Sequence, residues 1–561
     1  MKPTPTSRRI TPLLATLALA LTPLAHAAPA APTGANTFLQ QVQPAAPVAP
    51  ASNNTGLQIQ QPSGEALPPS APFLVKHIVI IGNTRINTAT LHALVAQAEG
   101  RQLTLSQLNA YVTQITDYYH SHGYPLAQAF IPAQTIHDGN VTVEVVEAHY
   151  GVIHLDNHSL VNTPLLMDTI SSLHSGAVVE QDGMSHDLLL LSDIPGVQTS
   201  ATLKPGQTVG TSDLNLVANP TPSVNGNVTA DNYGNTYTGR ARLGGTVNII
   251  DPLHQGDVLS VSGLTTGADM NYARLSYETL LNGEGMRAGG SYSALHYMLG
   301  STLSNLDGYG TAEIGSLWVK QPLIRSTDLN LYGQLQYDHL YLLDNIGVSN
   351  IHTDRQLDNW TASLYGDAST KGSNGTWNLG VTSGRVDYSN NAAQLADAAS
   401  ANTQGGFTKG NASFTYLQAL NASNALYLAL SGQAASTNLD ISQQMIAGGP
   451  YTVRAYDMGV LSGDSGYLGT LELRHDLGEM HGQWQLVGFY DTETLQVNKS
   501  LWAGAGSTNS ATLSGAGFGV NWLRNDQWSV KAYVAARLET PSVLIGSAPA
   551  ARAWLEVSKG F

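Results

Sequence analysis

Arg454 is the side chain whose surroundings point most clearly to a specific interaction. It lies in a stretch of small, apolar and aromatic residues, Gly448-Gly449-Pro450-Tyr451-Thr452-Val453-Arg454-Ala455-Tyr456-Asp457. A guanidinium always carries its charge, so the cation needs a carboxylate partner wherever such a segment is withdrawn from water. On an exposed loop, Arg454 is an ordinary solvated charge. The choice between these interpretations depends on what the flanking chain builds.

Residues with catalytic or metal-binding potential form no known constellation. Gly463-Asp464-Ser465-Gly466 superficially resembles the nucleophile segment of trypsin-like proteases, but no His or Asp segment of that family accompanies it, and Tyr467 replaces the next Gly. A serine nucleophile needs a base and an orienting acid. The 17 His residues never form His-Glu-x-x-His, and Gly-Lys-(Ser/Thr) does not occur. We therefore expect no catalytic residue, no metal site, no ATP site and no cofactor, and the chain is not expected to be an enzyme.

The composition indicates a membrane protein built from strands. Only 12% of the 561 residues are charged, yet the mean hydropathy is -0.08. Gly (56) and Tyr (24) are abundant and Cys is absent. Polar but weakly charged chains of this kind are typical of transmembrane β-barrels, which have polar interiors and aromatic girdles. The net charge of -15 argues against nucleic acid as a partner.

The N-terminal region divides into two segments. Residues 1–27 have the features of a secretory signal peptide, with a basic start, a short apolar core and the small-x-small site Ala25-His26-Ala27. Residues 28–72 are rich in Ala and Pro and nearly uncharged, which is typical of a linker. Within it, Asn36 to Val42 can form one or two helical turns.

Two mixed α/β units are expected next. Residues 73–148 give the order β-α-α-β-β, with a strand over 73–81, a helix opened by Thr104-Leu105-Ser106-Gln107, and strands over 129–136 and 141–146. Residues 149–218 repeat this order more loosely. Because a similar alternation recurs, the sequence predicts two related domains.

From about residue 222 to 561 the pattern changes to strands of roughly ten residues separated by turns. Sixteen strand starts can be assigned, near residues 224, 237, 256, 271, 286, 311, 327, 355, 374, 409, 424, 466, 482, 512, 527 and 552. Short connections alternate with mostly long ones, as expected for an outer-membrane barrel. Closure of such a sheet leaves no unpaired edge in lipid.

Several of these motifs together resemble the two-partner secretion transporters (the TpsB family, of the haemolysin/haemagglutinin activation-secretion type). The similarity rests on the 448–457 stretch, on Gly463-Asp464-Ser465-Gly466, on Leu471-Glu472-Leu473-Arg474, and on Asp231-Asn232-Tyr233-Gly234. It implies two periplasmic POTRA domains (73–148 and 149–218), a 16-stranded antiparallel barrel (222–561), and a long loop, 436–465, folded inside it. The short helix in 28–72 corresponds to a pore plug in that family.

The resemblance also assigns site residues. Val453, Arg454, Ala455 and Tyr456 are the loop motif, although the family usually has Gly where Ala455 stands. Gly488 and Phe489 belong to a barrel motif that ends in Asp491, the expected partner of Arg454. Glu493 replaces another family Gly and can compete for Arg454; the alternative is that Arg454 and Asp491 are separate charges of the barrel lining. Phe561 is the signal for the barrel-assembly machinery.

The function that the resemblance implies is secretion. POTRA domains would recognise an unfolded, β-rich exoprotein of the large TpsA β-helical type, and the barrel would move it across the outer membrane of a Gram-negative bacterium without ATP. Further partners are outer-membrane lipid and, during biogenesis, the barrel-assembly machinery. The alternatives are a factor that inserts other barrels, which usually carries more POTRA domains, and a passive porin.

Overall fold

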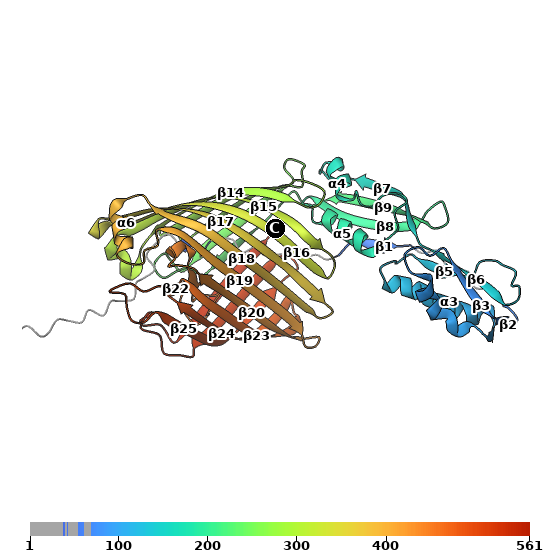
Figure 1. Ribbon diagram of the computed structural model, residues 1–561. Helices are drawn as coiled ribbons and strands as arrows, with labels where there is room; N and C mark the ends of the chain where they lie inside the picture. Colours follow the sequence, from blue (N-terminus) through green and yellow to red (C-terminus); the bar gives the residue numbers. More distant parts are fainter. Residues whose placement is uncertain (1–37, 40–41, 43–53, 61–68) are drawn as a thin grey trace, which may run out of the picture.

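A computed structural model describes residues 38–39, 42, 54–60 and 69–561. The expected signal peptide (1–27) and most of the expected linker (28–72) lie outside these residues. No helix in the described part is both long and apolar enough to cross a bilayer. Figure 1 shows three bodies in a row: a large barrel, a mixed α/β module against one end of it, and a second such module farther out.

Residues 73–148 form the outer, first module. Its elements are β2 (Phe73–Val75), β3 (His77–Ile81), α2 (Thr88–Val95), η1 (Ala96–Ala98), β4 (Arg101–Leu103), α3 (Leu105–Ser121), β5 (Gln128–Phe130) and β6 (Asn140–Val146). Helix α3 begins at a complete capping box between Thr104 and Gln107 and buries one apolar face: Leu108, Val112, Ile115 and Tyr119. That face covers a sheet of order β3-β6-β5, in which β3 and β6 are parallel.

Two strand expectations for this module were wrong. Residues 73–81 form two strands, because β2 pairs with β4 while β3 pairs with β6, and the chain turns where the Lys76 N–H binds the Gly139 carbonyl at 2.7 Å. The expected strand 129–136 ends at Phe130. Pro132 has no N–H for a sheet, and the side chain of Gln134 takes over the pairing by binding the backbone N–H and C=O of Thr142 at 2.8 and 2.7 Å.

A buried carboxylate closes the first module. Glu147 accepts hydrogen bonds from the backbone N–H groups of Thr84 and Arg85, both at 2.8 Å, from the Tyr119 hydroxyl at 2.7 Å, and from the Thr84 hydroxyl. Burial raises the pKa of Glu147, but the hydrogen bonds from Thr84, Arg85 and Tyr119 outweigh it and hold the pKa below its usual value. The ionised carboxylate therefore ties the loop after β3 and helix α3 to the end of β6.

Residues 149–220 form the second module, with β7 (His149–Asn157), α4 (Thr163–Thr169), α5 (Gln181–Ser192), β8 (Val197–Pro205) and β9 (Thr211–Pro220). The two helices pack on the sheet through a core that includes Leu166, Leu188 and Leu191. A short strand from the linker, β1 (Leu57–Ile59), adds in parallel to β8, so the sheet order is β1-β8-β9-β7. The composition of the linker gave no sign of this strand.

The remaining chain closes into one antiparallel barrel of 16 strands, which confirms the expected architecture. Strand β27 pairs back onto β10 and completes the ring. The strands are β10 (Val224–Asp231), β11 (Arg242–Ile250), β12 (Val258–Thr265), β13 (Met270–Leu280), β14 (Arg287–Met298), β15 (Gly308–Arg325), β16 (Leu329–Ile346), β17 (Ile351–Thr370), β18 (Ser373–Tyr388), β19 (Gly405–Ala419), β20 (Asn424–Ala435), β23 (Ser465–Glu479), β24 (Gln483–Gln496), β25 (Ser510–Leu523), β26 (Trp528–Arg537) and β27 (Ala551–Gly560). The connections at the end away from the modules carry η2 (Ser301–Leu306), η3 (Gly347–Ser349) and α6 (Asn391–Ala398).

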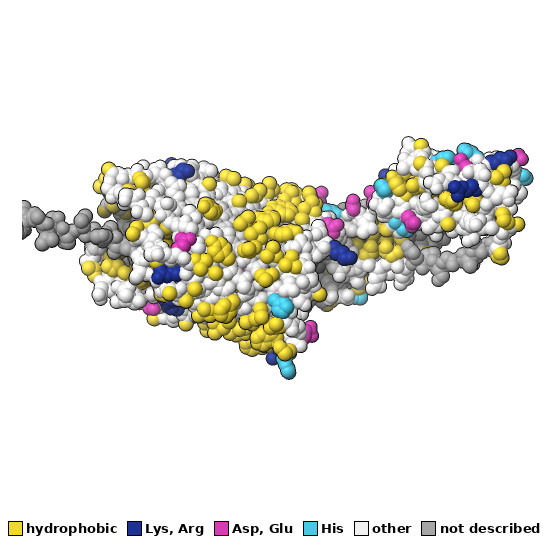
Figure 2. Space-filling view, turned by 90° about the horizontal axis from the view of Figure 1, so that it is seen from below, with side chains coloured by type: hydrophobic (Ala, Val, Ile, Leu, Met, Phe, Trp, Pro, Cys, Tyr) yellow, Lys and Arg dark blue, Asp and Glu magenta, His cyan; other side chains and the backbone are white. Residues whose placement is uncertain are grey.

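The strands differ from expectation mainly in length. A strand tilted through the hydrocarbon layer needs about 9–11 residues, whereas β15 and β16 have 18 and β17 has 20. This side of the wall therefore extends well past the layer. Outward side chains such as Leu486, Tyr490 and Phe518 are hydrophobic and exposed. On the face of the barrel that Figure 2 shows, hydrophobic side chains form a broad area with few charges in it. That surface matches the lipid-facing band of a transmembrane barrel.

The second module is attached to the barrel by a buried ion pair. Arg325, at the end of β15, donates from Nε and Nη2 to the two carboxylate oxygens of Asp193 at 2.7 and 2.9 Å. Its side chain is fully buried. Arg287 reinforces the junction by donating to the Asp193 carbonyl at 2.9 Å. A bidentate Arg–carboxylate pair fixes the relative orientation of the two side chains as well as their distance, so this contact holds the module at a defined angle to the barrel.

Candidate functional site: the loop folded into the barrel

Residues 436–465 fold back against the inner face of the barrel wall. The segment contains η4 (Ile441–Gln443) and a small hairpin, β21 (Met445–Ala447) with β22 (Leu461–Gly463). Along β24 the side chains of Val487, Phe489, Asp491, Glu493 and Leu495 point away from lipid and are buried, because the loop packs on them. This part of the inner wall is thus covered by the chain's own loop.

The tip of this loop depends on two glycines. Gly448 and Gly449 have φ of +84° and +122°, a region that side-chain-bearing residues rarely adopt. A Cβ on Gly448 would also lie 2.3 Å from the Asp457 carbonyl. These positions let the chain turn sharply and place the following residues, Val453 to Tyr456, on the wall.

Arg454 lies in the centre of the contact between the loop and the wall. Its Nε and Nη2 donate to Oδ2 and Oδ1 of Asp491 at 2.9 and 2.8 Å, and its backbone N–H reaches Oδ2 at 3.1 Å. Its Nη1 donates to Oε1 of Glu472 at 2.7 Å, and the guanidinium carbon lies 3.5 Å from the ring centroid of Phe489. The Thr470 hydroxyl completes the shell by donating to Asp491 at 3.0 Å. One cation therefore joins the loop to two neighbouring strands, β23 and β24.

The second carboxylate on Arg454 is Glu472, whereas the sequence pointed to Glu493 as the competitor. Glu493 is fully buried, and among the described residues the hydrogen bonds of Arg454 go to Asp491 and Glu472 and not to Glu493. Glu472 is in turn bound by Arg474 at 2.7 and 2.9 Å. The Glu-Leu-Arg motif that contains both residues was visible in the sequence. Alternation along β23 places Glu472 and Arg474 on the same face, and this was the signal for the second partner.

Ala455 fits because of a glycine on the facing strand. Its backbone does not adopt a positive φ. Its methyl group is buried against β25, where a Cβ added to Gly515 would come within 2.5 Å of the Ala455 Cβ. Val453 and Tyr456 are buried beside it and pack with Leu513. The departure from the family Gly is therefore accommodated by the absence of a side chain at position 515.

Further contacts hold the rest of the loop. Asp457 is bound by Arg240 at 3.0 Å and by Arg552. Asp440, at the start of η4, accepts a hydrogen bond from Nη1 of Arg355 at 2.8 Å, so the loop is also attached to β17, a strand separated from β23 by β18, β19 and β20. Asp464, the residue before Ser465, accepts the backbone N–H groups of Leu439 and Lys499 at 3.0 and 2.7 Å. It joins the two ends of the loop, a structural role for a segment that superficially resembled a protease motif. These pairs join residues far apart in sequence, and no local pattern marked them.

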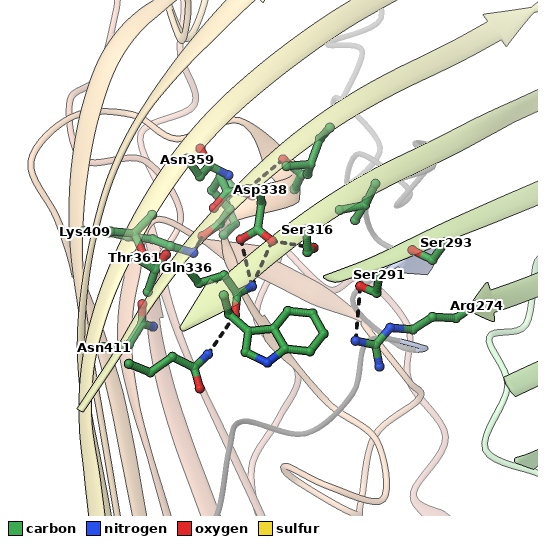
Figure 3. A pocket seen from close by; sticks show the side chains of 18 of the residues that line it. Arg274, Ser291, Ser293, Ser316, Gln336, Asp338, Asn359, Thr361, Lys409 and Asn411 are labelled. Carbon is green, nitrogen blue, oxygen red and sulfur yellow. Dashed lines mark hydrogen bonds between the residues drawn. The ribbon is translucent and has the colours of Figure 1, made fainter. Parts of the chain in front are cut away.

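A polar cavity of about 620 Å³ separates the loop from the opposite wall. Figure 3 shows its lining of side chains from β13 to β19: Arg274, Ser291, Ser293, Ser316, Gln336, Asp338, Asn359, Thr361, Lys409 and Asn411. Asp338 accepts from Ser316 at 2.6 Å and from Gln336 at 2.8 Å, and Lys409 donates to the loop carbonyl of Gln443 at 2.9 Å. Such a surface can hydrogen-bond water or an extended backbone.

The remaining predicted residues are placed as follows. Gly488 faces outward, and no atom lies within 4 Å of the position that a Cβ would take there. A larger side chain would therefore fit at this position. Phe561 exchanges backbone hydrogen bonds with Gly226 at 3.0 and 3.1 Å next to the closing strand pair, and its side chain is half exposed. Phe38 and Leu39, from the expected plug helix, are helical and buried among Leu295, Tyr297 and other inward residues.

Comparison with known proteins places these features in a family context. Residues 73–148 match the family description "POTRA domain, ShlB-type", and residues 210–522, more than half of the chain, match "Haemolysin secretion/activation protein ShlB/FhaC/HecB". A Heme/hemopexin transporter protein HuxB of Haemophilus influenzae is 27% identical over 506 residues, which cover 87% of each chain. An Outer membrane transporter CdiB of Escherichia coli is 28% identical over 191 residues, 34% of this chain and 32% of that one.

Solved structures show the same fold. CdiB from Escherichia coli superposes with a TM-score of 0.68 at 20% identity, covering 89% of this chain and 93% of that one. BamA from Haemophilus ducreyi, in a form lacking POTRA domains 1–3, gives a TM-score of 0.53 at 12% identity, covering 87% and 100%. At these identities the likeness concerns the fold alone.

Proposed function

The chain belongs to the ShlB/FhaC/HecB family of haemolysin secretion/activation proteins, and on that premise we propose that it exports one large, β-rich exoprotein of the TpsA type across the outer membrane of a Gram-negative bacterium. The observation that carries the proposal is the loop at 436–465, folded inside a closed barrel and attached to its wall through Arg454. A pore filled by a segment that is held by non-covalent contacts can be opened by breaking them.

The polar cavity between the loop and the opposite wall supports a conduit. Its hydroxyl and amide groups can satisfy the backbone of an extended client, which has no secondary structure of its own to pair its N–H and C=O groups. Displacement of the loop from Asp491 and Glu472 widens this space. Val453, Arg454, Ala455 and Tyr456 are thus proposed as the closing contact of the pore, with Asp491, Glu472 and Phe489 as their receptor on the wall.

The modules outside the barrel provide the recognition surface. The sheet of the first module has the order β3-β6-β5, so β3 and β5 are edge strands to which an unfolded client can add by backbone pairing. We assign residues 149–218 as a second POTRA domain, because they share the β-α-α-β-β order of the first. Both lie at the end of the barrel with short turns and are therefore assigned to the periplasm.

The direction of transport is set by folding of the client. The sequence contains no nucleotide-binding motif of the Walker type, and the proposal needs none, because folding of the client outside the cell prevents its return. Phe561, beside the closing strand pair, is proposed to be read by the barrel-assembly machinery during insertion. Phe38 and Leu39 are proposed to belong to a plug that leaves the lumen before the client enters.

Deletion of residues 73–148 tests the recognition role. The truncated chain should still reach the outer membrane as a heat-modifiable barrel but should release no client into the medium. Continued release would overturn the role of the first module. A client that is found inserted in the membrane, in cells with the intact chain, would favour a barrel-insertion factor. An unchanged set of secreted proteins in cells without the chain would favour a porin.

A further inference from the structure

Three side chains at one end of the first module converge on a single point. His77 starts β3, His92 lies in the last turn of α2, and Glu99 follows η1. The Nδ1 of His77 and the Nε2 of His92 each lie 3.1 Å from the same oxygen, Oε1 of Glu99. Within the described chain, this is the one group of three or more His, Cys, Asp or Glu side chains whose ligand atoms all lie within 4.8 Å of one another.

The spacing of these atoms matches a metal site. Zinc holds imidazole nitrogens and carboxylate oxygens at about 2.0–2.2 Å, which puts neighbouring ligand atoms of a tetrahedral site about 3.3 Å apart. Two edges of the triangle already measure 3.1 Å. Two imidazoles and one carboxylate are also a donor set that zinc uses in proteins, with a fourth position left open. The third edge, between Nδ1 of His77 and Nε2 of His92, is at most 4.8 Å, so all three ligand atoms can approach one ion.

The carboxylate at the centre is prepared for this role. The backbone N–H of Ile78 donates to Oε1 of Glu99 at 2.8 Å and fixes its position. A carboxyl group with an ordinary pKa of about 4.3 is already a negatively charged ligand at neutral pH. Each imidazole can present a lone pair when its proton is on the ring nitrogen that faces away from Glu99.

We propose that His77, His92 and Glu99 bind one divalent cation of the zinc class in the periplasmic part of the protein. The side chains of His77, His92 and Glu99 are 61%, 33% and 23% exposed, so the open coordination position faces water. The bound ion joins the start of β3 to α2 and η1. Because β3 is an edge strand, the ion stabilises the end of a surface on which another chain can pair.

The sequence did not reveal this site because the ligands follow no known motif. They are separated by 14 and 6 residues and come from a strand, a helix and a turn, so only the fold brings them together. The other interpretation of the cluster is a carboxylate that simply accepts hydrogen bonds from two imidazoles. The two interpretations differ in a measurable way, since only the first has affinity for zinc.

The test uses the full-length chain, purified in detergent through a tag without histidine and freed of metal by chelation. Zinc uptake is measured by equilibrium dialysis with chelator competition, and cobalt is used as a spectroscopic substitute. We expect one tight zinc per chain and a cobalt spectrum typical of four-coordinate nitrogen and oxygen ligands. His77→Gln, His92→Gln and Glu99→Gln should each weaken binding by at least about tenfold.

His158→Gln is the matched control. His158 is another exposed imidazole next to a carboxylate, 3.1 Å from Asp156, but it has no third ligand; this variant should bind zinc as the parent does. The proposal is overturned if the parent takes up no zinc at low-micromolar concentration, or if the three ligand variants retain the parent's affinity. The parent measurement decides the matter even if a variant fails to fold, and neither result depends on the export function.

Discussion

Replacing Arg454 with Ala removes the contact on which closure of the loop depends. The guanidinium makes three hydrogen bonds to two buried carboxylates, those of Asp491 and Glu472, and lies against the ring of Phe489. Its side chain is only 6% exposed, and Asp491 is fully buried. The substitution leaves Asp491 without a compensating charge, while Glu472 retains Arg474.

The size of the effect follows from this burial. Removing one partner of a buried ion pair costs about 3–5 kcal/mol. If that energy acts on the equilibrium between the loop folded on the wall and the loop released, the released fraction rises about 150- to 4,000-fold. The chain contains no cysteine, so Val453→Cys introduces a single thiol that is fully buried while the loop is in place. The labelling rate of this thiol by a soluble maleimide measures the released fraction.

We expect Arg454→Ala to raise the labelling rate of the Val453→Cys chain by that factor. Arg385→Ala is the control, because Arg385 is 66% exposed and its pair with Asp387 is on the surface; it should leave the rate unchanged. Equal labelling rates with and without Arg454 would refute the claim that this ion pair holds the loop.

Exchanging the charges refines the same test. Combining Arg454→Asp with Asp491→Arg should restore part of the closure, because the direct pair is rebuilt. Restoration should be incomplete, since the new carboxylate at position 454 faces Glu472. A double variant no better than Arg454→Asp alone would favour two independent charges of the barrel lining.

Three further predictions address the neighbouring contacts. Gly515→Ala should raise the labelling rate of the Val453→Cys thiol about 5- to 150-fold, because an overpacked contact costs about 1–3 kcal/mol. Adding Ala455→Gly should reverse this increase, and a lack of rescue would contradict the proposed fit. Glu147→Gln should destabilise the first module at neutral pH. The pKa of Glu147 is lowered in the folded state. The ionised carboxylate therefore contributes to folding stability at a pH above the unfolded-state pKa of about 4.3, and this contribution is lost as the pH falls through the folded-state pKa. Chemical unfolding of parent and variant should therefore converge in acid, and a difference independent of pH would count against the ionised carboxylate. Arg325→Ala should loosen the second module from the barrel, seen as faster proteolysis between them, whereas equal proteolysis would show that Asp193 does not hold the junction.

The barrel was predictable because its signal is local. Alternation with a period of two residues and short turns placed most strand starts within a few residues of the observed ones. The largest miss was β11, expected near Tyr237 and found from Arg242, because Asp231 and Asn235 side chains hold the intervening residues in a turn instead of a strand. Strand length was underestimated, since nothing local shows where a wall extends beyond lipid.

The site was only partly predictable. The motif gave Arg454 and Asp491, and alternation on β23 could have given Glu472. The pair between Arg355 and Asp440 joins residues whose proximity is decided by barrel closure and loop folding together. The metal ligands of the first module are hidden for the same reason. Interactions set by tertiary geometry leave no periodicity in the sequence.

Export itself is tested most directly by comparing the culture medium of cells that have this chain, lack it, or regain it from a plasmid. If the chain exports a client, one large β-rich protein should disappear from the medium when the chain is absent and return with the intact chain. An unchanged set of secreted proteins, or a client that accumulates as an integral barrel in the outer membrane, would contradict export.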